Sequence, residues 1–194
     1  METGKLIFIT GGARSGKSSF AEEYAASEAE IKAGSLHYIA TSRPADKEMI
    51  QRIKRHQEDR KKSRNTWITW ERPMELQAME PHFKQADVVL LDCLTVLLSN
   101  ELFQYELTDH PRENRHYEKK VYDAILEGVF SIVKTVHTLI VVSNEVLTEP
   151  LIGETVVRSY TKILGNLHQE IVKHAEKAYI VEAGIPILMK ERSC

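Results

Sequence analysis

The sequence has few cysteines and no long apolar run. Its two cysteines, Cys93 and Cys194, have a separation that fits neither a metal-binding motif nor a disulfide framework. So few thiols favour a reducing compartment. The longest apolar stretch, residues 88–98, is interrupted by Asp92 and is too short to cross a bilayer. The first residues lead directly into an apolar segment and lack the pattern of a secretory signal. We therefore expect a soluble, cytoplasmic protein.

The sequence also lacks an excess of either charge. Its 26 Lys and Arg residues and 28 Asp and Glu residues give a net charge of −2. Such a balance provides no global basic field that would attract nucleic acid or a membrane surface. The locally basic run at residues 52–64 is either a solvated helix face and loop or a rim that attracts phosphate. With 194 residues, 42% of them hydrophobic, and no repeat or linker, we expect a single domain spanning residues 1–194.

The most informative motif is GGARSGKS at residues 11–18, which has the form G-x-x-x-x-G-K-S. It follows an apolar strand pattern and precedes a helical one, the context of a phosphate-binding P-loop. Lys17 can reach the β- and γ-phosphates of a nucleotide, and the Ser18 hydroxyl can bind Mg²⁺. An ordinary strand–turn–helix corner is the less favoured alternative, because all eight positions fit. The predicted triphosphate-binding residues are Gly11, Gly12, Ala13, Arg14, Ser15, Gly16, Lys17 and Ser18.

The hydrophobic pattern alternates between strands and helices along the chain. Strands are expected at 5–10, 36–41, 67–70, 87–92, 138–143, 178–182 and 186–190, and helices at 17–28, 46–58, 115–136 and 156–175. Several strands are almost continuously apolar, as parallel strands covered on both faces must be. The expected fold is therefore a doubly wound, mostly parallel α/β sheet with helices on both faces, of the RecA-like P-loop NTPase architecture. The polar segment 99–116 is either a lid over the site or a surface connection.

A second signal for phosphate chemistry is the strand VVLLD, which ends in Asp92. In P-loop proteins this position places a carboxylate beside the Mg²⁺ that the loop hydroxyl binds. Ser18 and Asp92 are therefore the predicted metal ligands, although a strand-end aspartate can instead cap a helix. The short chain, without a convincing guanine-specificity motif or arginine-finger region, favours a small-molecule kinase or nucleotidyltransferase over a motor or GTPase.

Further motifs follow the P-loop in a specific order: YIATS at 38–42, DKEM at 46–49, RIKRH at 52–56, Asp59-Arg60, WITWE at 67–71, LDCLT at 91–95, Ser99-Asn100 and SNEV at 143–146. Over nearly the whole chain, this series resembles the bifunctional adenosylcobinamide kinase / adenosylcobinamide-phosphate guanylyltransferase family of cobalamin biosynthesis. The resemblance implies two reactions. A nucleoside triphosphate phosphorylates the aminopropanol hydroxyl of adenosylcobinamide, and GTP then transfers GMP to a histidine. The cobinamide phosphate takes up that GMP, giving adenosylcobinamide-GDP.

The resemblance assigns roles to individual residues. His56 would be the guanylylated nucleophile, with Lys17 as the second catalytic residue; without the motif, His56 is best interpreted as a buried structural histidine. Glu71 would contact guanine, although a solvated glutamate fits that position equally well. Asn144 and Glu145 would lie near the γ-phosphate or serve as a cap. The further nucleotide contacts implied by the resemblance are Thr41, Ser42, Arg43, Gln57, Glu58, Asp59, Arg60 and Asp92.

The end of the chain departs from the family pattern at Leu147, Thr161, Lys162 and His168, which puts the binding of the corrinoid in question. The expected ligands are Mg²⁺, GTP, ATP, adenosylcobinamide and its phosphate, and the resemblance implies a homo-oligomer, specifically a trimer. Two other functions remain open at this point. One is a single-function P-loop small-molecule kinase in which His56 is structural. The other is a nucleotide-dependent regulatory module with little turnover.

Overall fold

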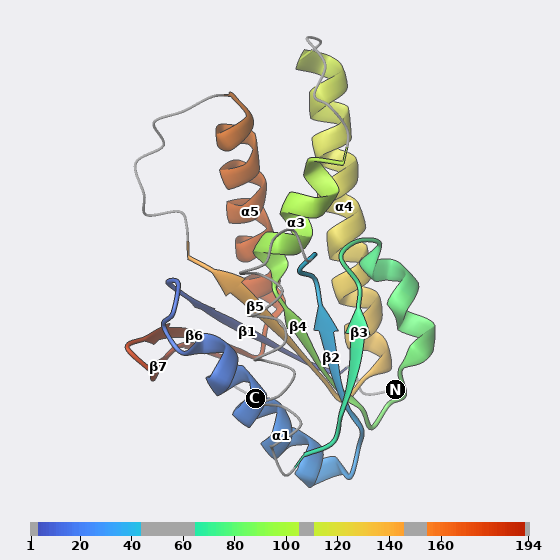
Figure 1. Ribbon diagram of the computed structural model, residues 1–194, viewed down its shortest axis with the longest axis vertical. Coiled ribbons are helices and arrows are strands. Elements are labelled where there is room, and N and C mark those ends of the chain that lie inside the picture. The colour runs from blue at the N-terminus through green and yellow to red at the C-terminus, as the bar shows by residue number, and fades with distance from the viewer. Residues whose placement is uncertain (1–3, 44–64, 105–110, 146–154, 193–194) are drawn as a thin grey trace.

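The computed structural model describes residues 4–43, 65–104, 111–145 and 155–192, which form one seven-stranded sheet flanked by helices (Figure 1). The strand order is β3-β2-β4-β5-β1-β6-β7, and all neighbouring pairs are parallel except the antiparallel β6–β7 hairpin. The strands are β1 Lys5–Gly11, β2 Leu36–Ala40, β3 Trp67–Glu71, β4 Val88–Asp92, β5 Thr138–Asn144, β6 Lys177–Glu182 and β7 Ile185–Glu191.

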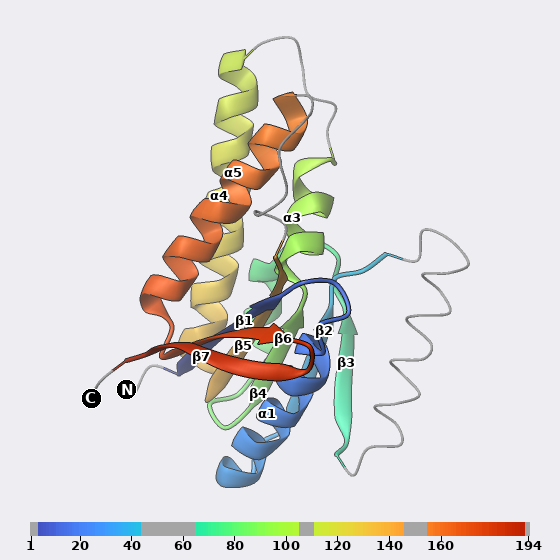
Figure 2. The same ribbon diagram turned by 90° about the vertical axis from the view of Figure 1, so that its left-hand side faces the viewer.

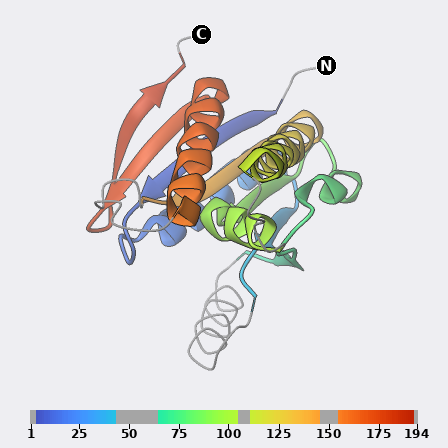
Figure 3. The same cartoon turned by 90° about the horizontal axis from the view of Figure 1, so that it is seen from above.

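Helices cover both faces of the sheet. The α1 helix, Lys17–Lys32, packs on one face, and the opposite face carries α3, Leu94–Leu102, α4, Pro111–Thr135, and α5, Thr155–His174 (Figures 1 and 3). A short 3₁₀ helix, η1, Leu76–His82, packs against α4. This doubly wound arrangement confirms the predicted fold class. No helix within the described ranges has the length and apolar character needed to cross a membrane.

The two hydrophobic cores follow directly from the strand sequences. In β4, Val88 and Leu90 pack on the α1 side, whereas Val89 and Leu91 pack beneath α3, α4 and α5. Successive residues of a strand point to opposite faces, so a strand covered on both sides must be apolar at every position. This requirement explains why the strands read as unbroken apolar runs in the sequence.

The segment between β4 and α4 corrects one expectation. Residues 94–102, the last four of which were assigned to the irregular segment 99–116, form the helix α3. Its buried residues Leu94, Leu97, Leu98 and Leu102 recur at helical spacing and fill the core. The polar Ser99 and Asn100 lie between them and obscured that pattern. In addition, α4 begins at Pro111 rather than residue 115, and η1 was not predicted. The helix predicted at residues 46–58 lies outside the described residues.

The strand order determines which loops meet. Strand β5 lies between β1 and β4, with Gly11 opposite Asn144 and Asp92 opposite Val142. The carboxyl ends of these parallel strands therefore share one edge of the sheet, where ligands bind in open α/β folds. In RecA-like P-loop NTPases, one strand lies between the strand before the P-loop and the strand that ends in the metal-binding carboxylate. Here β5 lies in the same way between β1 and β4, which ends in Asp92.

Candidate functional site

The P-loop joins β1 to α1 through a backbone shape that requires glycine at two positions. Gly16, which precedes α1, has a φ of 91° in the left-handed region, where a β-carbon is disfavoured. A β-carbon on Gly11 would lie 2.4 Å from the carbonyl oxygen of Val181 and 2.7 Å from Ser15 Oγ, which is too close for either atom. Within the described part of the chain, no side chain caps the start of α1. Its first N–H groups can therefore bind an anion.

Polar side chains around this loop have the chemistry of a phosphate site. Lys17 is only 8% exposed, and its Nζ donates a hydrogen bond to the carbonyl oxygen of Gly12 at 3.0 Å. Ser15 Oγ is buried and has no hydrogen-bond partner among the described residues. A buried hydroxyl without a partner is unfavourable, so this hydroxyl is suited to donate to an added acceptor such as a phosphate oxygen.

The β6–β7 hairpin supports the P-loop from outside. The N–H of Gly184 donates a hydrogen bond to the carbonyl oxygen of Ser15 at 2.8 Å. Ala183 and Gly184 have φ values of 50° and 81°, the positive values required by a two-residue type I′ hairpin turn. Figure 2 shows this turn beside the start of α1. Sequence reasoning did not assign this role to Gly184, although an Ala-Gly pair between two strand patterns is a signal for such a turn.

Asp92 lies at the end of β4 and is held by Tyr38 of β2 and by Thr41, which directly follows β2. The Tyr38 hydroxyl donates a hydrogen bond to Asp92 Oδ2 at 2.8 Å, and the Thr41 N–H donates to the Asp92 carbonyl oxygen at 3.1 Å. Asp92 shares its face of β4 with Leu90, whose side chain packs on the α1 side. The carboxylate therefore lies on the face of the sheet that carries the start of α1.

The loop after β4 is tied to the neighbouring strand ends. The Thr41 hydroxyl donates to the carbonyl oxygen of Cys93 at 2.9 Å and accepts from the Cys93 N–H at 2.8 Å. The Asn144 amide donates to Thr95 Oγ1 at 3.0 Å, and the Glu145 N–H donates to the carbonyl oxygen of Gly11 at 2.9 Å. Burial raises the pKa of the Cys93 thiol, so this cysteine is not an activated nucleophile.

The predicted nucleotide contacts fall into two groups on the same sheet edge. Thr41, Ser42 and Arg43 follow β2, which lies three strands from β1, or about 14 Å at the usual strand spacing. Glu71 ends β3, one strand further away, and is exposed. Contact of these residues with nucleotide stays a prediction. The predicted residues that lie outside the described part of the chain are His56, Gln57, Glu58, Asp59 and Arg60.

The candidate metal ligands offer only oxygen. The described residues contain no group of three or more His, Cys, Asp and Glu side chains that could hold a metal ion. Magnesium is commonly bound through one or two carboxylates together with substrate phosphates and water. A hydroxyl at Ser18 and a carboxylate at Asp92, beside a phosphate loop, fit magnesium that arrives with the nucleotide.

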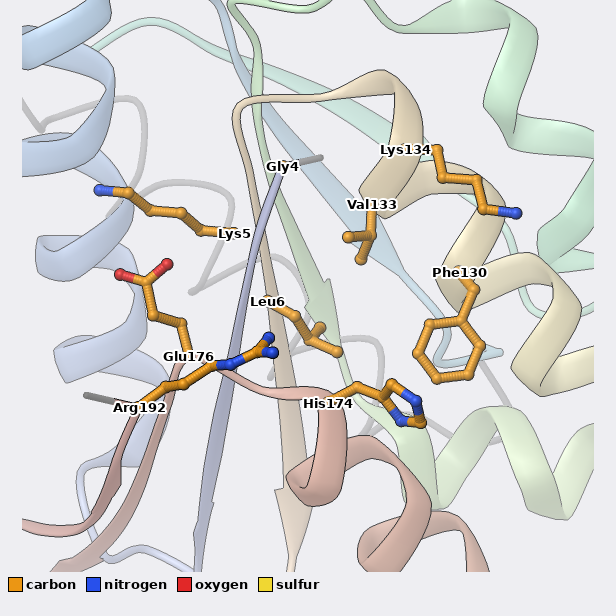
Figure 4. Close-up of a pocket in the computed structure, with 9 residues that line it drawn as sticks. All are labelled: Gly4, Lys5, Leu6, Phe130, Val133, Lys134, His174, Glu176 and Arg192. Carbon is orange, nitrogen blue, oxygen red and sulfur yellow. The ribbon is translucent and has the colours of Figure 1, made fainter. Parts of the chain in front are cut away.

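A separate hollow lies at the opposite edge of the sheet (Figure 4). It has a volume of about 470 Å³ and is lined from the start of β1 by Lys5 and Leu6, and from the helix ends by Phe130 and His174. Its lining residues include none of the predicted site residues. The cavity is therefore separate from the predicted phosphate site.

Comparison with known proteins agrees with this geometry. A family model described as cobinamide kinase / cobinamide phosphate guanyltransferase matches residues 7–189. The bifunctional adenosylcobalamin biosynthesis protein CobU of Escherichia coli is 29% identical over 187 residues, covering 95% of this chain and 99% of that protein. The bifunctional adenosylcobalamin biosynthesis protein CobP of Pseudomonas aeruginosa is 35% identical over 184 residues, covering 94% and 95% respectively.

Among solved structures, the flagellar accessory protein FlaH of Methanocaldococcus jannaschii aligns with a TM-score of 0.49 and 13% identity, over 99% of this chain and 80% of that one. The fold assignment rests on the strand order and the P-loop described above. The family model matches residues 7–189, which is nearly the whole chain. The chain therefore belongs to the cobinamide kinase / cobinamide phosphate guanyltransferase family.

Proposed function

We propose that this enzyme, a transferase by its family, phosphorylates adenosylcobinamide and then guanylylates the product through a histidine–GMP intermediate. The observation that carries the proposal is the meeting of the P-loop and Asp92 at one edge of the sheet. The buried Ser15 hydroxyl, which has no partner among the described residues, and the nearly buried Lys17 support phosphate binding there. The single-function kinase remains the alternative.

In the kinase step, the aminopropanol hydroxyl oxygen attacks the γ-phosphorus, and the bond between that phosphorus and the β,γ-bridging oxygen breaks. The nucleoside diphosphate leaves with the bridging oxygen. Lys17 and the N–H groups at the start of α1 hold the negative charge of the phosphates. Ser18 and Asp92 would hold Mg²⁺, which neutralises charge on the phosphate oxygens when bound. Glu145, whose backbone N–H donates to the carbonyl oxygen of the P-loop residue Gly11, would orient the substrate hydroxyl and accept its proton.

In the guanylyl step, a ring nitrogen of His56 attacks the α-phosphorus of GTP, and pyrophosphate leaves. An oxygen of the cobinamide phosphate then attacks the histidine-bound phosphorus, and the P–N bond breaks to release adenosylcobinamide-GDP. An unprotonated imidazole nitrogen is a competent nucleophile for this chemistry. The assignment of His56 rests on the R-I-x-x-H motif at residues 52–56. Arg60 would neutralise the leaving pyrophosphate.

A homo-oligomer, specifically a trimer, is proposed from the resemblance, and the edge strand β7 offers a surface for subunit contact. Four of its apolar side chains are exposed, namely Ile185, Ile187, Leu188 and Met189. Exposed apolar edge strands are usually covered in native proteins. The use of ATP and GTP fits our expectation of a cytoplasmic location.

The test is product analysis after incubation of the enzyme with adenosylcobinamide, GTP and Mg²⁺. The wild type should form adenosylcobinamide-GDP. The His56→Ala variant should stop at the cobinamide phosphate, because only the second reaction needs the histidine. The Lys17→Ala variant should form neither product. Adenosylcobinamide-GDP made by His56→Ala at the wild-type rate would exclude the proposed intermediate, and phosphate as the only wild-type product would favour the single-function kinase.

A further inference from the structure

We infer that Tyr38 is a positioning residue for the Asp92 carboxylate and thereby sets the affinity of the enzyme for Mg²⁺ in the nucleotide complex. This inference rests on the proposed function, because it takes Asp92 as a metal ligand. Tyr38 belongs to the motif that follows the P-loop, but neither its spacing nor its residue type suggested a contact with β4.

The contact is direct and partly buried. The Tyr38 hydroxyl donates to Asp92 Oδ2 at 2.8 Å, a normal length for such a bond, and the tyrosine is only 6% exposed. A carboxylate has two oxygens and about four acceptor positions. One hydrogen bond to Oδ2 therefore fixes the rotation of the group and leaves Oδ1 for a cation.

The position of the hydroxyl follows from the sheet. Parallel pairing places Ala40 beside Asp92 and Tyr38 beside Leu90, so the tyrosine starts two residues before the aspartate on the same face. Its ring packs edge-on against Trp67 of β3, with ring centroids 6.0 Å apart and an interplanar angle of 84°. The tyrosine ring therefore extends along the sheet from the level of Leu90 to the level of Asp92, which brings its hydroxyl to the end of β4.

The main chain of Asp92 is held by Thr41, the residue that directly follows β2. The Thr41 N–H donates to the Asp92 carbonyl oxygen, and the Thr41 hydroxyl bonds both the N–H and the carbonyl oxygen of Cys93. These contacts fix the backbone position of Asp92, whereas the contact from Tyr38 acts on the carboxylate itself. Removing the Tyr38 hydroxyl should therefore loosen the side chain and leave the backbone in place.

Partners that orient a metal-binding carboxylate commonly change metal affinity by about 10–100-fold when they are mutated. If Tyr38 only filled the core, its substitution would affect nucleotide affinity differently. Affinity would fall equally with and without metal, because the P-loop itself would be disturbed. The metal dependence of binding therefore separates the two roles.

The test compares Tyr38→Phe with the wild type by calorimetric titration of GTP, first in EDTA and then over a series of Mg²⁺ concentrations. Phenylalanine keeps the ring against Trp67 and removes only the hydroxyl. We expect GTP affinity in EDTA within about twofold of wild type and a Mg²⁺ midpoint at least about tenfold higher. Tyr24→Phe is the matched control, since Tyr24 packs on the same face of the sheet and its hydroxyl interacts with Tyr179. This control should leave the midpoint unchanged.

Two results would overturn the inference: an unchanged Mg²⁺ midpoint in Tyr38→Phe, or an equal loss of affinity with and without metal. The variant Asp92→Asn separates failure of the inference from failure of the proposed function. If Asp92→Asn leaves the midpoint unchanged, Asp92 is not a metal ligand and both proposals about it fall. If Asp92→Asn raises the midpoint, adding Tyr38→Phe to it should cause no further rise, and a further rise would show that Tyr38 acts elsewhere.

Discussion

Ser143 and His168 form a buried pair in which Ser143 Oγ lies 2.7 Å from His168 Nε2. The pair joins the end of β5 to α5, and Phe8 of β1 packs edge-on against the imidazole. Burial lowers the pKa of His168 to about 4, against the opposing effect of the Glu145 charge. One of the departures from the family pattern is therefore a neutral histidine that contacts Ser143 of β5 and Phe8 of the P-loop strand β1.

This pair predicts an acid-sensitive contribution to stability. The unfolded chain takes up the His168 proton as the pH falls through 6.5, whereas the folded protein takes it up only near pH 4. The neutral, buried histidine therefore contributes its full stabilisation above pH 6.5. As the pH falls from 6.5 towards 4, the free energy of unfolding decreases by about 3 kcal/mol. Thermal unfolding between pH 4 and pH 7 should show a steeper acid loss in the wild type than in His168→Asn. Parallel curves would contradict this account. His37 and His137, whose pKa values burial also lowers, are present in both proteins.

Two neighbouring glycines of the P-loop should respond differently to alanine. A β-carbon at Gly11 meets the carbonyl oxygen of Val181 at 2.4 Å, whereas one at Gly12 meets no described atom within 4 Å. We expect Gly11→Ala to lower the free energy of unfolding by about 1–3 kcal/mol, the usual cost of overpacking. The variant Gly12→Ala should unfold at nearly the wild-type denaturant midpoint. Equal midpoints for the two variants in urea titrations would show that the loop is not packed against β6.

Removal of the Thr41 hydroxyl should destabilise the strand ends. Thr41 is fully buried, and Thr41→Val leaves the Cys93 N–H without the acceptor it has now. An unsatisfied buried donor costs about 1–3 kcal/mol. Urea unfolding should show this loss in Thr41→Val and a much smaller one in Thr41→Ser, which keeps the hydroxyl. A loss of the same size in Thr41→Ser would assign the effect to the methyl group. The same two variants test whether Thr41 also affects nucleotide affinity.

Sequence patterns predicted the strands and the P-loop because these features are local. A buried parallel strand must be apolar along its length, and the P-loop needs its glycines, lysine and serine in a fixed order. The short helix α3 was missed because Ser99 and Asn100 interrupt its leucines, although both helical spacing and burial are clear in the structure.

The contacts that shape the site could not be predicted in this way. Tyr38 and Asp92 are 54 residues apart in the chain, and Ser143 and His168 are 25 apart. Such pairs depend on strand order and register, which local patterns do not specify. The proposed guanylyl-transfer role of His56 rests only on the family motif, and His56 lies outside the described residues.

Loss of the P-loop lysine should affect transfer far more than the fold. Lys17 is the first residue of α1, its Nζ donates a hydrogen bond to the carbonyl oxygen of Gly12, and it would contact the phosphates that carry charge in the transition state. We expect Lys17→Met to lower kcat of the kinase step by about 10²–10³-fold. A coupled assay of nucleoside diphosphate release measures this change. Lys190→Met is a control for loss of a lysine elsewhere, because Lys190 Nζ bonds main-chain oxygens at the end of α5. Similar rates for Lys17→Met and wild type would remove Lys17 from the mechanism.

The intact mass of the protein after incubation with GTP and Mg²⁺ tests the central claim most directly. The proposed intermediate predicts an acid-labile increase equal to one GMP in the wild type and none in His56→Asn. Both proteins should first be shown to bind GTP, so that an absent adduct is not an absent ligand. A wild-type protein that binds GTP and gains no mass, or a His56→Asn variant that gains the same mass, would contradict guanylyl transfer through His56.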